Sequence, residues 1–466
     1  MIRMKKIEFP GIWIILIAVL LSVPCQAQEN NWKTIFNGKD LDGWQQLNGK
    51  HIWEVKNGMI VGTTVPGEPN GFLCTNKEYG DFVLELEVSI DTLMNNSGIQ
   101  FRTLSYPDYN NGRVHGYQME VDPKPQQWSG AIYEEGGNRG WIYTGEQLSP
   151  AAKRAFKRDQ KNGFQWNKYR IECVGTTIRT WINEVPTAHL IDARFLRGYI
   201  GLQLHANQAN DPAGSYKVRF RNIRIQTGDL KLSPLDKTYV VNLLPNNLSA
   251  QEEKNGYTLL WDGRSSKGWN GPNSSEFPKN AWSIKDGEMA MLKPEGTESP
   301  YLITEEQFGP FELKFDFKLS IGANSGIKYF VSESEASRSS ALSSLEYQII
   351  DDSASGVSDN RTLGSLADIL GSKKTPSTVK RTGEWNQAFI RARADNQVEY
   401  WLNGNKILEF KRGSAEYKDL VAKSKYKDLP NFGMSPKGHI LLENNGSAVS
   451  YRSLKINRNL PVSSNQ

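Results

Sequence analysis

The sequence predicts an all-β protein made of two tandem antiparallel β-sandwich domains with short helices in the loops. Hydrophobic and polar residues alternate along short segments such as 82–88 and 311–317, as they do in half-buried strands. A series of motifs also occurs twice in the same order, which indicates a duplicated domain. The 41 glycines favour the same class, because a fold of many short strands needs many turns.

The duplication is visible in pairs of matching motifs. Gly43-Trp44, Asn96-Ser97-Gly98-Ile99, Trp166-Asn167 and Trp181-Ile182-Asn183 recur as Gly268-Trp269, Asn324-Ser325-Gly326-Ile327, Trp385-Asn386 and Trp401-Leu402-Asn403. Between 227 and 248 the periodicity lapses and prolines appear, which is typical of a connection between domains. We therefore predict domains at 29–228 and 246–459, joined by a linker at 229–245.

Local signals place further elements inside each domain. Residues 169–174 and 176–183 predict a hairpin around Gly175, and the second half repeats this pattern. Short helices are predicted at 150–157 and 249–255. The second of these begins with Ser249 and Glu252, whose spacing is that of a capping box.

Residues 1–27 have the features of a secretory signal peptide. Basic residues at 3, 5 and 6 precede an apolar run at 11–23 that is short for a membrane span, and small residues follow at Cys25 and Ala27. The alternative is a lipoprotein in which Cys25 is the modified residue, although Pro24 fits that signal poorly. We expect an exported protein, periplasmic or at the cell surface, without a membrane span.

The net charge limits the classes of binding partner, and the cysteine content limits the possible disulfides. The formal net charge of +5 is small for 466 residues and is not clustered, so nucleic acid is not expected as a partner. Cys74 and Cys173 remain after removal of the signal peptide, and export is compatible with either a disulfide or two free thiols. The sequence does not indicate an oligomeric state.

The first half contains an ordered series of family-like motifs. They lie at residues 36–44, 79–82, 96–102, 116–122, 130–135, 166–167, 202–205 and 220–223. In this order they resemble the 3-keto-disaccharide hydrolase domain, and the resemblance extends over nearly all of both halves. It implies a concanavalin-like jelly roll that acts on an oxidised sugar, a 3-keto-glycoside.

Strand alternation gives an independent indication of a site. Gln100 shares a strand face with Arg102, and Gln203 shares one with His205. A third strand places three polar residues on one face: Gln118, Glu120 and Asp122. If these faces line one concave sheet, they form a groove of the size of a sugar. The alternative is an ordinary solvated sheet face.

The chemistry implied by the family assigns roles to these residues. A ketone at C3 acidifies the C2 proton, so proton abstraction and loss of the C1 substituent give a 1,2-elimination, and later addition of water gives net hydrolysis. We predict His205 as the base, Arg102 as the stabiliser of the enolate, and Glu120 or Glu134 as the acid. The alternatives are a structural histidine, an Arg102–Glu120 ion pair, and a divalent cation held by Glu120, Asp122 and His205.

The Gly-rich segment 134–141 is the remaining candidate for sugar contacts. Glu134, Arg139 and Trp141 are predicted to bind substrate there together with Gln100, Gln118, Asp122 and Gln203, and a tight turn with exposed charges is the alternative. In the second half Phe330 replaces Arg102, Glu443 replaces Gln203 and Asn445 replaces His205. We therefore predict that activity resides in residues 29–228.

Two other functions compete with this hypothesis. A laminarinase-type glycosidase would continue Glu120-Val121-Asp122 with a third acid, but Pro123 follows and no such acid arrives. A non-catalytic carbohydrate-binding module is the stronger alternative, because jelly rolls with aromatic loops also serve as binding domains.

Overall fold

The protein is described by a computed structural model that covers residues 31–158, 165–207, 215–292, 301–332, 343–353, 357–375, 378–446 and 448–460. The predicted signal peptide and Cys25 lie outside these residues. Strands make up most of the regular structure, as predicted. No helix in the described ranges is both long and apolar enough to cross a membrane.

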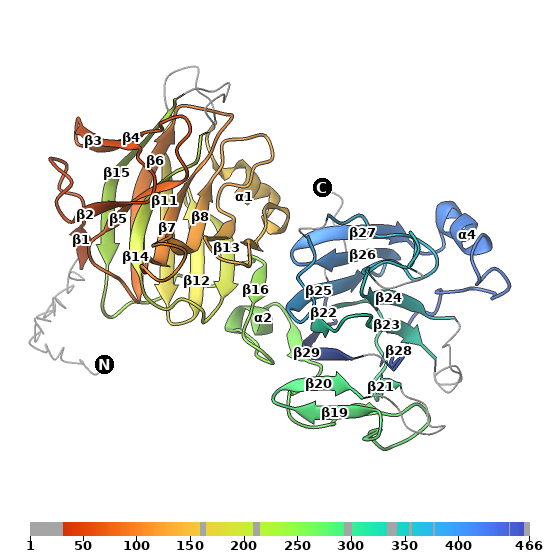
Figure 1. The fold of residues 1–466 in the computed structure, drawn as a ribbon. Helices are drawn as coiled ribbons and strands as arrows, with labels where there is room; N and C mark the ends of the chain where they lie inside the picture. The colour runs from red at the N-terminus through yellow and green to blue at the C-terminus, as the bar shows by residue number, and fades with distance from the viewer. Residues whose placement is uncertain are drawn as a thin grey trace, which may run out of the picture.

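The first half folds as two mainly antiparallel sheets packed face to face, coloured red to green in Figure 1. The sheet that carries the site has the order β10 (Trp141–Tyr143), β9 (Ile132–Glu135), β8 (His115–Val121), β7 (Ser97–Leu104), β14 (Tyr199–Leu204), β5 (Gly71–Thr75) and β2 (Trp44–Leu47). The opposite sheet has the order β16 (Val240–Asn242), β13 (Val185–Ile191), β12 (Thr177–Ile182), β11 (Asn167–Val174), β6 (Phe82–Ile90), β15 (Lys217–Gln226), β4 (Met59–Thr63) and β3 (Ile52–Lys56), with β1 (Trp32–Thr34) beside β15.

The core of the first half lies between these sheets and follows from the alternation in sequence. Ile99 and Phe101 on β7 and Met119 on β8 are fully buried and belong to one hydrophobic cluster with Leu84 and Leu86 of β6. Burial of apolar area contributes about 25 cal/mol per Å2, so this face holds the strands together. Gln100 of β7, Gln118 and Glu120 of β8 and Gln203 of β14 are thereby directed to the other face. Cys74 and Cys173 are free buried thiols.

The second half repeats the architecture. One sheet has the order β19 (Trp282–Lys285), β20 (Glu288–Met291), β29 (Val449–Asn457), β22 (Phe311–Leu319), β25 (Trp385–Ala392), β26 (Gln397–Leu402) and β27 (Asn405–Lys411), with β17 (Tyr257–Leu259) beside β29. The other has the order β18 (Trp269–Asn270), β21 (Leu302–Thr304), β28 (His439–Leu442), β23 (Asn324–Val331) and β24 (Leu345–Ile350).

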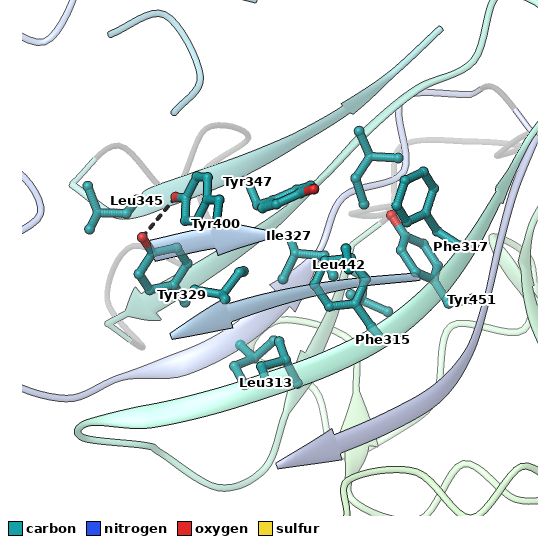
Figure 2. Close-up of a cluster of buried hydrophobic side chains, with 14 of the residues drawn as sticks. Leu313, Phe315, Phe317, Ile327, Tyr329, Leu345, Tyr347, Tyr400, Leu442 and Tyr451 are labelled. Carbon is teal, nitrogen blue, oxygen red and sulfur yellow. Dashed lines mark hydrogen bonds between the residues drawn. The ribbon is translucent and has the colours of Figure 1, made fainter. Parts of the chain in front are cut away.

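The core of the second half is richer in tyrosine than that of a purely aliphatic sandwich. Figure 2 shows Phe315 of one sheet beside Ile327 and Leu442 of the other. The hydroxyls of Tyr329 and Tyr400 lie 2.8 Å apart in a hydrogen bond, so each satisfies a polar group of the other inside the core.

Short helices occupy the loops. The helix predicted at 150–157 is α1 (Pro150–Ala155), which ends two residues early because Phe156 is extended and buried. The predicted capping box of α2 (Ala250–Lys254) is confirmed, since Ser249 and Glu252 each bond the backbone N–H of the other. The 3-10 turn η1 (Gly145–Gln147) and helix α4 (Ala415–Ala422) were not predicted from the sequence.

The connection between the halves is ordered. Within the segment 229–245, β16 pairs in parallel with β13 and so extends a sheet of the first half before the chain enters α2 (Figure 1). Glu252 of α2 then lies 3.1 Å from Lys455 of the second half. Direct hydrogen bonds also join the halves, among them Thr144 Oγ1 to the Gly404 carbonyl at 2.6 Å.

Candidate functional site

A polar groove of about 570 Å3 lies on the sheet of the first half that contains β7, β8 and β14. Its walls come from β8, β9, β10 and β14 and from the loops beside them. The lining residues are Asn70, Asn96, Asn110, Arg113, Gln118, Glu120, Tyr133, Glu135, Gly136, Gly137, Trp141, Gln203 and His205. Its volume is within the range of small-molecule sites, about 300–1,000 Å3.

Hydrogen-bonded amides form the floor of the groove. Gln118 Nε2 donates to Glu120 Oε2 at 2.8 Å, and Gln203 Nε2 donates to Gln118 Oε1 at 2.8 Å. Gln100, which is fully buried under this layer, also donates to Gln118 Oε1. The network fixes the side chains of three neighbouring strands, so the groove is preformed.

Gly98 explains why the Asn-Ser-Gly-Ile motif borders this floor. It lies opposite Glu120 in the β7–β8 register, and a Cβ at this position would overlap with the Gln118 side chain. The repeated Gly326 stands in the same relation to Glu346 in the second half. The repeated glycine therefore gives space to a long polar side chain of the neighbouring strand.

Glu120 is a buried carboxyl group of the groove. The side chain is buried, and this burial raises the pKa of Glu120 to about 8, with a further contribution from the nearby Asp122 carboxylate and a partial offset from the Gln118 hydrogen bond. At neutral pH the carboxyl group therefore retains its proton. A carboxylic acid in this state can protonate a leaving group.

His205 follows β14 directly and has the opposite property. Burial lowers the pKa of His205 below its ordinary value, so the imidazole is neutral at neutral pH. Its Nδ1 lies 2.9 Å from the Ala206 carbonyl, which only accepts, so Nδ1 carries the proton and Nε2 keeps its lone pair. Asn70 fixes this turn because its Oδ1 accepts from the Ala206 N–H at 2.7 Å.

Glu135, which the sequence places in the Gly-rich segment 134–141, and Arg113, which sequence reasoning missed, are further functional candidates. They form an ion pair at the groove, and Gln203 Nε2 donates to Glu135 Oε2 at 3.2 Å. In the β8–β9 register Glu135 is opposite Gly116, whereas Glu134 is opposite Tyr117, a residue of the core face. The strand register, which pairs Glu134 with a residue of the core face, is the signal that distinguishes the two glutamates.

The prediction for Arg102 is wrong. A β-bulge between Phe101 and Leu104 and a φ of 47° at Arg102 interrupt the alternation, so Arg102 does not share the face of Gln100. The fully buried guanidinium donates to the Gly80 carbonyl at 2.9 Å, to the Gly175 carbonyl at 2.8 Å and to Asp81 at 3.0 Å. It ties two turns together and is absent from the groove lining.

Glu134 and Arg139 are also placed away from the groove, contrary to prediction. The Glu134 carboxylate lies 2.6 Å from Arg139 Nε and 3.3 Å from Arg194, and Arg139 reaches Asp192 at 2.7 Å. The Tyr117 hydroxyl donates to the same Asp192 at 2.7 Å. This charged network anchors the 134–141 segment to the core, and only Trp141 of the three predicted residues lines the groove.

Asp122 does not join Glu120 at the groove surface. Its carboxylate accepts from the Lys124 N–H at 3.1 Å and from Gln126 Nε2 at 2.6 Å, which closes the loop after β8. In the described part of the chain, no group of three or more His, Cys, Asp and Glu side chains is arranged to hold a metal ion, so the predicted trio of Glu120, Asp122 and His205 is not assembled as one.

The structure thus brings together five of the predicted residues in one groove: Gln118, Glu120, Trp141, Gln203 and His205. A preformed polar groove with an aromatic rim on a β-sandwich is typical of carbohydrate-active proteins.

The sequence comparison specifies the family. Residues 31–226 and 256–457 both match the profile of the 3-keto-alpha-glucoside-1,2-lyase-like domain, so the chain belongs to this family and contains two copies of its domain. Over 239 residues the chain is 28% identical to a 3-keto-disaccharide hydrolase of Bacteroides thetaiotaomicron, a match that covers 45% of this chain and 81% of the relative.

Two crystal structures assigned as glycosyl hydrolases of Parabacteroides distasonis are also similar to this chain. The first is 28% identical with a TM-score of 0.42 and covers 46% of this chain and 99% of its own. The second is 25% identical with a TM-score of 0.34 and covers 43% of this chain and 98% of its own.

Proposed function

We propose that the groove of the first half cleaves 3-keto-glycosides by removing the C2 proton and expelling the C1 substituent. The observation that carries this proposal is the pair formed by a carboxylic acid that stays protonated at neutral pH, Glu120, and a neutral imidazole with an available Nε2, His205. An elimination requires both states at the same pH. The name of the Bacteroides relative supports the same substrate class.

The reaction divides between these residues. His205 Nε2 takes the proton from C2, which the neighbouring C3 ketone has acidified, and the electron pair forms an enolate. As the enolate collapses, the C1–O bond breaks and the leaving oxygen takes the proton of Glu120. The products are a 1,2-unsaturated 3-keto sugar and a free alcohol. Addition of water across this double bond returns a hydroxyl to C1 and a proton to C2, which is net hydrolysis.

Arg113 replaces Arg102 as the proposed cation for the enolate. Its guanidinium lines the groove beside Glu135, whose carboxylate holds it in place. A fixed positive group at the oxygen where charge develops stabilises the transition state, and removal of one such donor typically costs about 10²- to 10³-fold in rate. Glu135 is a positioning residue in this scheme.

We also propose that the protein acts outside the cytoplasm, since residues 1–27 resemble an export signal. N-terminal sequencing of the protein recovered from the periplasmic fraction tests this point. A mature terminus at Gln28 is the expected result, and a cytoplasmic protein with an intact N-terminus would contradict it.

Two matched chromogenic glucosides test the activity, one with a ketone at C3 and one without. We expect release of the chromophore from the keto-glucoside alone, with a primary isotope effect when C2 carries deuterium. A parallel assay with chelator shows whether a divalent cation takes part. Equal release from both glucosides would contradict the elimination, and saturable binding without release would favour the carbohydrate-binding module.

A further inference from the structure

A second cavity lies between the two halves of the chain. It has a volume of about 330 Å3, and both halves contribute to its walls. Trp141 and Arg194 come from the first half, and Lys380, Glu384, Trp385 and Gln387 come from the second. The groove described above contains no residue of the second half, so this cavity is a different space.

Trp141 connects the two spaces, because it lines both the groove and the cavity. Its indole is held by edge contacts with Trp128 and Tyr133, whose ring centroids lie 4.7 and 5.1 Å away. The second half also fixes the loop before Trp141, since Lys380 Nζ donates to the Arg139 carbonyl at 2.6 Å. Trp141 is thus an ordered aromatic side chain that belongs to the walls of both spaces.

The order of the strands places the proposed acid and base at different distances from Trp141. Across the sheet, His205 follows β14, Glu120 lies on β8, Tyr133 on β9 and Trp141 on β10 at the edge. In register, Gln118 is opposite Tyr133, and Tyr133 is opposite Trp141. The proposed acid therefore lies on the side of the groove that leads to the cavity, and the proposed base lies on the other side.

We propose that the cavity between the halves binds the sugar unit that leaves from a 3-keto-disaccharide. This inference rests on the function proposed above, because the group that Glu120 protonates is the one that lies toward Tyr133 and Trp141. The indoles of Trp141 and Trp385 supply apolar faces for a pyranose ring, and the side chains of Arg194, Glu384 and Gln387 supply hydrogen-bonding groups for its hydroxyls. The second half is then a specificity domain.

Two substrates that share the same oxidised sugar and differ in the leaving group test the inference. The rates on a 3-keto-disaccharide and on a methyl 3-keto-glucoside are measured for the full chain and for its Trp385→Ala variant. We expect kcat/KM for the disaccharide to fall about tenfold through KM, because one aromatic wall is lost. For the methyl glycoside the change stays under about twofold, since its leaving group is too small to reach Trp385.

Trp166→Ala is the matched control. Trp166 is the repeat counterpart of Trp385, stacks on Arg221 at 3.8 Å as Trp385 stacks on Arg452 at 4.0 Å, and is not part of the cavity. We expect it to leave the ratio of the two substrates unchanged. If Trp385→Ala lowers the yield of folded protein, Trp385→Leu keeps the apolar volume and removes only the aromatic face.

The outcomes separate the two proposals. Turnover of both substrates with a ratio that Trp385→Ala and Trp385→Leu leave unchanged would overturn the cavity proposal and leave the function intact. If the unaltered protein cleaves neither substrate, the proposed function fails. Titration calorimetry of the disaccharide then tests whether the cavity binds the leaving sugar. Weaker binding by Trp385→Ala supports the cavity proposal, and equal binding overturns it.

Discussion

The two halves of the chain use the same strands to build two different polar centres. In the first half, Gln100, Gln118 and Gln203 form a layer of neutral amides beside Glu120 and His205. The corresponding positions of the second half hold charges. Lys328 lies 3.1 Å from Glu346 and 2.8 Å from Glu443, and Asn445 stands where the first half has His205.

The electrostatic consequences differ. In the second half the two carboxylates raise the pKa of Lys328 despite its burial, so the lysine stays a cation and does not serve as a base. In the first half burial outweighs the opposing effect of Lys124, so the proton of Glu120 is retained to about pH 8. The comparison teaches that the two copies share a backbone but differ in their polar centres: an ion triad stands in the place of the amide layer, and Gln348 and Asn445 stand in the places of Glu120 and His205.

The shared backbone extends to its irregularities. Arg102 and Phe330 both have positive φ, 47° and 59°, and each lies in a bulge of the strand that carries the motif. One of these residues anchors turns by hydrogen bonds, and the other packs in the core. The same strand geometry thus tolerates a buried arginine or a phenylalanine, which explains why neither is part of a groove.

Glu120→Gln is the change with the largest expected effect. It removes the proposed proton donor and keeps the shape and the Gln118 contact, so the rate on a 3-keto-glycoside with a poor leaving group falls by about 10²- to 10⁴-fold. The control is Gln348→Ala at the corresponding strand position of the second half, which should keep the parent rate. A loss of the same size in the control would show that cleavage also requires Gln348 of the second half.

Lys328→Met tests the ion triad through stability. The change leaves Glu346 and Glu443 buried without their cation, so we expect the free energy of unfolding to fall by about 3 kcal/mol at pH 8. At pH 4 the loss shrinks, because Glu346, whose pKa burial raises to about 7, takes up a proton. Urea denaturation at the two pH values measures this difference.

Gln100→Met is the matched variant in the first half. It removes one neutral hydrogen bond and should cost about 1 kcal/mol with little dependence on pH. Equal losses for the two variants at both pH values would show that the triad is not ionised as described.

The pH profile gives the smallest effect that still separates the proposed roles. The base must be unprotonated and the acid protonated, so kcat/KM should fall about tenfold per pH unit above about 8 as Glu120 loses its proton. On the acid side the rate should persist below the ordinary pKa of histidine, because burial lowers the pKa of His205. Glu120→Gln should lack the alkaline decline, and its persistence would assign that limb to another group.

Much of the fold and half of the site could be predicted from the sequence. Alternation identified the groove face of β8 and β14, because no bulge interrupts those strands at Gln118, Glu120 and Gln203. It failed at Arg102, where one left-handed residue changes the direction of the side chain. Such a bulge leaves no hydrophobic signal in the sequence.

Strand register and tertiary contacts account for the other differences between the predicted site and the structure. Glu134 and Glu135 are adjacent, and only the pairing of β9 with β8 decides which of them reaches the groove. Arg113 and Asn70 come from loops, where no periodicity predicts the direction of a side chain. The ion triad was likewise not predicted, since Lys328 was not recognised as the counterpart of Gln100.

The central claim is that the proposed acid and base for cleavage of 3-keto-glycosides lie in the first half. The most direct measurement is the rate of the full chain carrying His205→Ala compared with the full chain carrying Asn445→Ala, on the same 3-keto-glucoside. The account predicts a loss of about 10²- to 10⁴-fold for His205→Ala and the parent rate for Asn445→Ala. Parent-like turnover by His205→Ala, or an equal loss in both variants, would contradict it.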